Sequence, residues 1–252
     1  MHMTTQGIVL REVDYKESDK ILTVLTAQAG RQTVSARGCR KKGSPIAAAA
    51  QLLVYSELTL YEFQGRWSLK EAAITRQFRA AREDLFKLAL GSYFAELTEL
   101  LTEEDVPAPQ VLSLLLNSLH VLDTTGRPLE QVKAVFELKL MSLAGYEPLL
   151  DACAVCGMEA AEPRLHLREG VLHCAACRDG VGDGISMPLS PGVLAAMRHV
   201  VYGDPKRLFS FQLPPEGQRQ MGDVCEAFVL TQLERGFRTL DFYKQLTAMP
   251  KE

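Results

Sequence analysis

The hydrophobic positions of the first eighty residues follow a period of two. Short apolar runs occupy residues 8–10 and 21–25, and residues 31–36 continue the pattern after Gly30. Apolar and polar side chains alternate over residues 52–60 and again from Trp67, on either side of Gln64-Gly65. This period is typical of half-buried strands, and the glycines mark turns. We therefore predict four or five strands between residues 6 and 80 that close into a small barrel, the alternative being a small open sheet packed on helices.

From about residue 78 the apolar period changes to three and four, which predicts amphipathic helices. Prolines and glycines separate them, among them Pro107, Pro109 and Pro214-Pro215. The expected helices span about residues 85–101, 111–122, 132–144, 191–202 and 216–246. The expected fold class is α+β, with a β-barrel domain over residues 1–80 and a helical domain over 81–252. The helical domain carries a small insertion at about residues 150–180.

That insertion contains two Cys-x-x-Cys pairs, Cys153 with Cys156 and Cys174 with Cys177. Four thiolates with this spacing close a tetrahedron around one Zn²⁺ ion and leave no open ligand position. The apolar residues around Arg168-Glu169-Gly170 predict a hairpin between the two pairs. We therefore expect a zinc-ribbon-like segment whose ion is structural and contributes on the order of 10 kcal/mol to folding.

Three other roles of paired cysteines are disulfide formation, redox chemistry and catalytic metal binding. Disulfides fit poorly, because the N-terminus lacks the pattern of a secretory signal and a cytoplasmic chain keeps its thiols reduced. A redox motif needs only one pair, and a catalytic zinc needs an open position with a general base, for which His173 has no His-x-Glu context. No apolar run approaches the length of a membrane span, so no membrane role is expected.

Charge is distributed unevenly between the two predicted domains. Residues 1–80 carry 12 Lys and Arg against 7 Asp and Glu, whereas residues 81–252 carry 16 against 24. A polyanion is therefore expected to meet the N-terminal part. Arg37, Arg40, Lys41 and Lys42 lie within six residues, before Gly43-Ser44-Pro45. We expect a flexible cationic loop here that follows a phosphate backbone, the alternative being a charged loop that is merely solvated.

Other cations of the same domain are expected to extend this surface, namely Arg31, Lys16, Lys20, Arg66, Lys70, Arg76 and Arg79. Phe63 and Trp67 flank a hairpin turn and are candidates for base stacking, although Trp67 is in phase with Leu69 and is better explained as a core residue. The sequence contains no helix-turn-helix pattern, phosphate-binding Gly-Lys-Ser/Thr loop or nucleophile elbow. These patterns favour a binding protein over an enzyme.

Several segments together resemble the RecO family of recombination-mediator proteins. The similarity covers most of residues 6–180 and is weaker afterwards. It is carried by residues 7–10, 15–22, 38–44 (Gly-Cys-Arg-Lys-Lys-Gly-Ser), 93–97 (Tyr-Phe-Ala-Glu-Leu), 136–140, 145–148 (Gly-Tyr-Glu-Pro) and 153–157 (Cys-Ala-Val-Cys-Gly). One departure is residues 47–50, four alanines where the family usually has bulkier side chains.

The resemblance implies an N-terminal OB-fold barrel, a helical domain and a zinc-binding segment. It implies a non-enzymatic mediator of DNA repair in the RecF pathway, cytoplasmic and nucleoid-associated. Such a protein binds single- and double-stranded DNA, anneals complementary strands and works with RecR to load RecA onto strands coated with single-strand-binding protein, with RecF as a possible partner. The alternative function is a protein-interaction adaptor that has a structural zinc ribbon and only incidental contact with nucleic acid.

Overall fold

A computed structural model describes residues 1–177 and 183–248 of the chain. The chain forms two compact units, one of Met1–Thr125 with Phe237–Glu252 and one of Gly126–Gly236. The boundary predicted at residue 80 marks the change from strands to helices, whereas the first unit contains both. Residues 178–180, the end of the predicted metal segment, lie outside the described residues.

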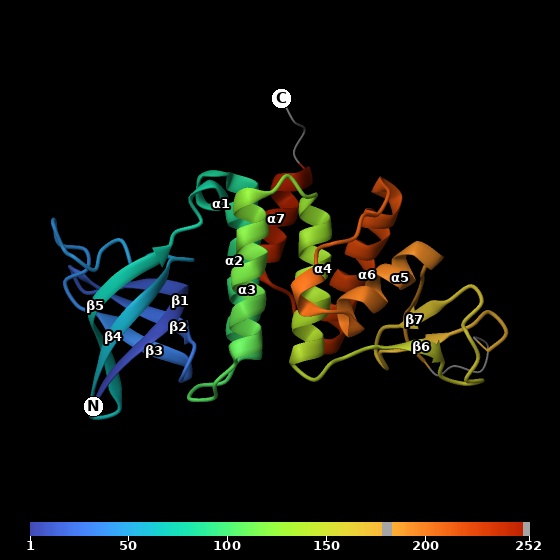
Figure 1. Ribbon diagram of the computed structural model, residues 1–252, viewed down its shortest axis with the longest axis horizontal. Coiled ribbons are helices and arrows are strands. Elements are labelled where there is room, and N and C mark those ends of the chain that lie inside the picture. Colours follow the sequence, from blue (N-terminus) through green and yellow to red (C-terminus); the bar gives the residue numbers. More distant parts are fainter. Residues whose placement is uncertain (178–182, 249–252) are drawn as a thin grey trace. The chain divides into compact units, whose positions relative to one another are not determined.

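The first unit begins with a closed five-stranded barrel of strand order β1-β2-β3-β5-β4 (Figure 1). The strands are β1 (His2–Tyr15), β2 (Asp19–Thr26), β3 (Gly30–Ala36), β4 (Tyr55–Phe63) and β5 (Arg66–Arg76). Strand β1 is long enough to pair with β4 through its first half and with β2 through its second. Strands β3 and β5 run parallel and close the barrel. This topology is that of an OB-like barrel, so the predicted closed barrel is confirmed.

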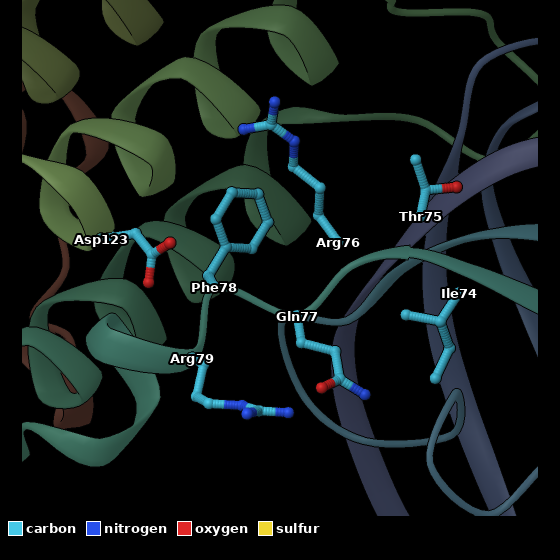
Figure 2. A pocket seen from close by; sticks show the side chains of 7 residues that line it. All are labelled: Ile74, Thr75, Arg76, Gln77, Phe78, Arg79 and Asp123. Atoms are coloured by element: carbon cyan, nitrogen blue, oxygen red, sulfur yellow. The ribbon is translucent and has the colours of Figure 1, made fainter.

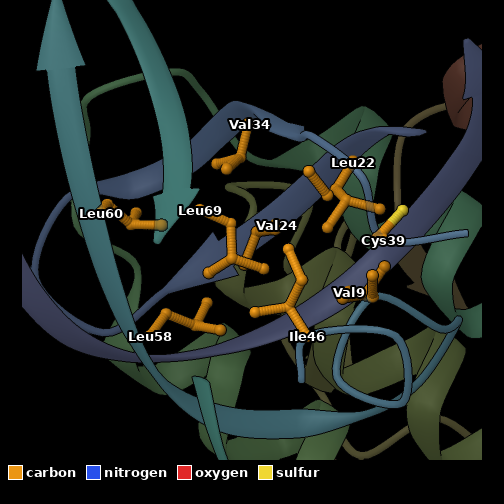
Figure 3. Close-up of a cluster of buried hydrophobic side chains, with 11 residues drawn as sticks. Val9, Leu22, Val24, Val34, Cys39, Ile46, Leu58, Leu60 and Leu69 are labelled. Carbon is orange, nitrogen blue, oxygen red and sulfur yellow. The ribbon is translucent and has the colours of Figure 1, made fainter. Parts of the chain in front are cut away.

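The interior of the barrel is filled by the side chains that the period of two selects. Leu58 and Leu60 on β4 and Leu69 on β5 are buried, and Trp67 packs against the same cluster. Figure 3 shows that the segment between β3 and β4 also contributes, because Cys39 and Ile46 point into this core. The loop that carries the cations is therefore anchored by its own apolar residues.

Four helices complete the first unit: α1 (Arg79–Glu83), α2 (Leu85–Leu101), α3 (Pro109–Thr124) and α7 (Arg238–Ala248). Asp84 caps α2, since its carboxylate accepts hydrogen bonds from the Phe86 and Lys87 N–H groups at 2.9 and 3.0 Å. Helix α7 packs against α2, with the Tyr93 and Phe237 rings edge to face at 5.6 Å.

The single helix predicted over residues 216–246 is wrong. The segment forms two helices, α6 (Pro215–Leu233) and α7, because Glu234 adopts a left-handed φ of 50° and Gly236 follows. The Thr239 N–H donates to the Glu96 carboxylate at 3.2 Å, which attaches the start of α7 to α2. The interruption therefore lets the chain return to the first unit.

The second unit holds α4 (Leu129–Leu143), α5 (Pro191–Tyr202), the short 3-10 helix η2 (Pro205–Arg207) and α6. Its four-stranded sheet has the order β6-β8-β7-β9, formed by β6 (Leu149–Cys153), β7 (Arg164–His166), β8 (Val171–His173) and β9 (Ser186–Pro188). The antiparallel pair β7–β8 is the hairpin predicted around residues 168–170.

Between α4 and α6 lies a buried ion cluster. The Lys133 ammonium is 3.0 Å from the Glu137 carboxylate and 2.8 Å from that of Glu226. Burial by itself disfavours this ammonium, but the two carboxylates outweigh it and raise the pKa of Lys133.

Within residues 1–177 and 183–248, no helix combines the length and the hydropathy that crossing a membrane requires.

Candidate nucleic-acid interface and metal centre

The four predicted cysteine ligands converge on one point of the second unit. The sulfur atoms of Cys153, Cys156, Cys174 and Cys177, hereafter the cysteine tetrad, all lie within 4.8 Å of one another. Cys153 is the last residue of β6, and Cys174 directly follows β8. Because β6 and β8 pair in parallel with Cys153 opposite Leu172, the sheet brings the two Cys-x-x-Cys segments together.

Each Cys-x-x-Cys segment is a tight turn. The Gly157 N–H donates to the Cys153 carbonyl at 2.9 Å, and Gly157 supplies the left-handed φ of 69° that the turn requires. The Cys177 N–H donates to the Cys174 carbonyl at 3.1 Å in the second turn. Backbone N–H groups of Cys156 and Cys174 also donate to the Cys153 sulfur and lower the pKa of this thiol to about 6.

The tetrad fits a tetrahedral zinc ion in both distance and charge. A Zn–S bond of about 2.3 Å requires sulfur atoms about 3.8 Å apart, and the Cys156 and Cys174 sulfurs are 3.9 Å apart. Hydrogen bonding to Cys174 and burial raise the pKa of Cys177 to about 12, and a cation bound by the tetrad would stabilise its thiolate. All four cysteines are free thiols. They would hold one ion with no position left for a substrate.

The predicted cationic residues are only partly gathered. Antiparallel pairing places the turn after Tyr15 and the exit of β3 at one end of the barrel, since Tyr15 faces Asp19 and Lys20 faces Ala36. We call residues 15–19 the hairpin tip and residues 37–44 the basic loop. Six predicted cations share this end: Lys16, Lys20, Arg37, Arg40, Lys41 and Lys42.

Hydrogen bonds hold the basic loop against the hairpin tip. The Gly38 N–H donates to the Asp19 carboxylate at 2.7 Å, and the Arg40 N–H donates to the Ser18 carbonyl at 3.0 Å. The Gly38 hydrogen bond lowers the pKa of Asp19, with smaller contributions from Ser18 and from nearby cations. Cys39 between these two bonds is buried in the barrel. The loop therefore differs from the freely flexible one expected, although its charged side chains remain outside.

Neighbouring carboxylates neutralise part of this end. Arg40 lies 3.2 Å from Asp14, and Lys20 pairs with Glu12. By contrast, the side chains of Lys16, Arg37, Lys41 and Lys42 are exposed, and none of them forms a salt bridge within the described part of the chain. At this end of the barrel, the positive charge that no salt bridge neutralises therefore lies on these four side chains. We call this part of the molecule the cationic end of the barrel.

The other predicted cations lie elsewhere on the first unit. Arg31 is at the opposite end of β3, where it lies 3.5 Å from Glu104 and donates to the Thr102 carbonyl at 3.0 Å. Arg66 is exposed beside the β4–β5 turn, and Lys70 lies over the Tyr61 ring.

Arg76 and Arg79 line an open pocket of about 440 Å³ at the junction of β5 and α1, together with Asp123. Figure 2 shows their guanidinium groups extending in different directions. The Arg76 guanidinium is 3.1 Å from His120 Nδ1. These two arginines therefore line a pocket of their own, where β5 passes into α1.

One residue of the hairpin tip was not singled out by the sequence pattern. Tyr15 is 48% exposed, and the Lys16 ammonium lies 5.2 Å from the centre of its ring. The signal was available in the sequence, because Tyr15 directly precedes a lysine in a turn between two strands. Its closeness to the basic loop depends on the strand register, which the sequence alone does not supply.

Both the barrel and the helical part of the chain match the same family of known proteins. Residues 1–78 match the family model described as Recombination protein O N terminal, and residues 82–241 match Recombination protein O C terminal. The DNA repair protein RecO of Acetivibrio thermocellus is 30% identical over 247 residues, which is 97% of each chain. That of Symbiobacterium thermophilum is 34% identical over 245 residues, covering 95% of this chain and 96% of the relative. That of Bacillus pumilus is 31% identical over 251 residues, covering 100% and 97%.

Proposed function

The chain belongs to the RecO family of DNA repair and recombination proteins, and on this premise we propose that it is a recombination mediator of the RecF pathway. In this role it binds single- and double-stranded DNA and anneals complementary strands. Together with RecR it helps to load RecA onto DNA coated with single-strand-binding protein. The role requires binding and charge neutralisation, and we propose no catalytic step.

The observation that carries this proposal is the cationic end of the barrel. Four exposed cations, Lys16, Arg37, Lys41 and Lys42, form no salt bridge within the described residues, and a short, hydrogen-bonded loop presents three of them. Cations placed on phosphates release condensed counterions, which drives binding without reference to sequence. They also reduce the repulsion between two strands, which is what annealing requires.

The cysteine tetrad supports a structural zinc ion in the same proposal. The ion would hold the β6–β8 turns together, and the tetrad offers it no site for chemistry. We propose that partners contact the helical part, namely RecR and the tail of single-strand-binding protein, with RecF as a further candidate. The proposed location is the cytoplasm, in association with the nucleoid.

The test removes two of these four exposed cations. The variant K41A/K42A should bind single strands and duplexes more weakly, whatever their sequence. The slope of log affinity against log salt should fall by about 1.4 for single strands and about 1.8 for duplexes. Fluorescence anisotropy across a salt titration measures both quantities.

A matched control is K206A/R207A, which removes two adjacent exposed cations from the second unit. It should leave affinity and slope close to the wild type. If K41A/K42A keeps the wild-type affinity and slope, the basic loop is not the DNA-binding site. A separate assay tests the mediator role directly. It measures the annealing of complementary strands by the wild type, with and without single-strand-binding protein.

A second candidate function, the protein-interaction adaptor, is favoured by the surface of the metal segment. Four large apolar side chains within or beside this segment are between 60% and 69% exposed, namely Leu149, Val155, Met158 and Ile185. An adaptor would give no shift of bare oligonucleotide near physiological salt, whereas the mediator would.

A further inference from the structure

The hairpin tip combines an exposed aromatic ring with the cationic surface. Tyr15 ends β1 and pairs with Asp19, whose carboxylate accepts the hydrogen bond from Gly38 at the start of the basic loop. Two successive contacts, the Tyr15–Asp19 strand pair and the hydrogen bond from Gly38 to the Asp19 side chain, therefore place Tyr15 near the start of the basic loop. At 48% exposure, about half of the residue is open to solvent.

The face of this ring already accepts a charged partner. The Lys16 ammonium lies 5.2 Å from the ring centre, the arrangement of a cation–π contact. The contact is with a solvent-exposed lysine, so it is weak and exchangeable. A nucleobase is a larger flat partner for the same ring face and would displace the Lys16 ammonium from it.

Other aromatic residues of the barrel lack this combination beside the basic loop. Tyr61 also has an ammonium over its ring, that of Lys70, but Tyr61 pairs with His2 at the opposite end of β1 from Tyr15. Trp67 is partly buried and packs against the barrel core. Phe63 is 60% exposed, but it lies at the end of β4 that pairs near His2, the opposite end of β1 from Tyr15. Base stacking beside the basic loop would therefore fall to Tyr15.

We propose that Tyr15 stacks on an unpaired nucleobase while Lys16 and the basic loop hold the flanking phosphates, so that this end of the barrel prefers single strands. The inference rests on the proposed function and specifies its substrate. In a duplex both faces of each base are covered by neighbouring bases, so only the phosphate contacts remain. Stacking of this kind is tolerant of sequence, as every base has a π-face.

The experiment compares Tyr15→Ala with the wild type on a single strand of about 16 nucleotides and on the duplex of equal length. Tyr15→Ala should lose about fivefold or more in affinity for the single strand and keep its duplex affinity. The salt slope should not change, because no cation is removed. Tyr15→Phe keeps the ring and should restore the single-strand affinity.

Phe242→Ala is the matched control, since Phe242 lies on α7 and is 47% exposed. It should bind both substrates as the wild type does. If Tyr15→Ala weakens both substrates equally, or neither, the stacking role is overturned while the proposed function stands. If the wild type binds neither substrate, the proposed function fails and the inference fails with it.

Discussion

At the scale of single residues, the cationic end of the barrel depends on Asp19. Its carboxylate accepts the Gly38 N–H, the largest cause of the lowered pKa of Asp19, and the Lys16 and Arg37 charges lower it further. An acidic residue inside a cationic cluster thus has a positional role. It fixes the point where the basic loop leaves β3 and so determines where Arg37 and its neighbours are presented.

The pH dependence of this contact follows from the sign of the pKa shift. A lowered pKa means that the stabilising contact is complete above the ordinary Asp value of about 3.9 and is lost as the pH falls through the lower, folded-state value. In an NMR titration, Asp19 should therefore titrate below about 3.9, and the Gly38 amide resonance should follow the same midpoint. Asp19→Asn should abolish the response of Gly38, whereas Glu17→Gln in the same turn should not. An Asp19 midpoint at or above 3.9 would contradict the contact.

At the scale of elements, the loop between α2 and α3 attaches the barrel to the helices of the first unit. The Arg31 N–H donates to the Glu103 carbonyl at 3.2 Å, and the Gln32 side chain donates to Asp105 at 2.8 Å. Gly30, which has a left-handed φ of 60°, lies directly against the Val106 backbone. This close approach leaves no room for a side chain.

Gly30→Ala should therefore destabilise the protein by about 2 kcal/mol or more. The added Cβ would lie 2.1 Å from the Val106 carbonyl oxygen, and a left-handed residue with a side chain is also strained. Gly65→Ala is the matched control, because Gly65 has a φ of 74° but no atom within 4 Å of the added Cβ. Chemical denaturation should show a clearly larger loss for Gly30→Ala. Equal losses would mean that only backbone strain matters and that the loop contact contributes nothing.

At the scale of the whole molecule, the sheets of the two units have different sources of stability. The barrel of the first unit has a continuous apolar core, whereas the sheet of the second consists of strands of only three to five residues. Strands this short bury little apolar surface, and a metal ion that joins two of their turns can supply what the core lacks. Loss of the ion should therefore affect the second unit selectively.

Metal analysis of freshly purified protein should find one zinc ion per chain. Cys156→Ser should lower this content and the hydrogen-exchange protection of residues 149–188, while the barrel keeps its protection and its affinity for DNA. Cys225→Ala, which removes a buried cysteine from α6 of the same unit, should retain the metal. Absence of zinc together with paired disulfides would refute the structural role of the tetrad.

Local patterns in the sequence predict much of the architecture. The period of two predicts the five strands, the period of three and four predicts most of the helices, and two Cys-x-x-Cys pairs predict the tetrad. The hydrophobic periods involve residues that are near one another in the chain. The spacing within each Cys-x-x-Cys pair is typical of metal ligands and can be recognised without the structure. For the same reason the sequence alone predicts a basic loop from the run Arg37, Arg40, Lys41 and Lys42, and its role in binding DNA stays a prediction.

Only the tertiary structure decided which charges are available and which elements share a unit. Arg40 pairs with Asp14, Arg31 with Glu104, and Lys133 lies between Glu137 and the distant Glu226. The end of the chain leaves the second unit and packs on α2 as α7, where a continuous helix was predicted. Contacts of this kind join residues far apart in sequence. They form only when strand register and helix packing bring distant segments together. The local hydrophobic pattern of the sequence does not determine which distant segments meet.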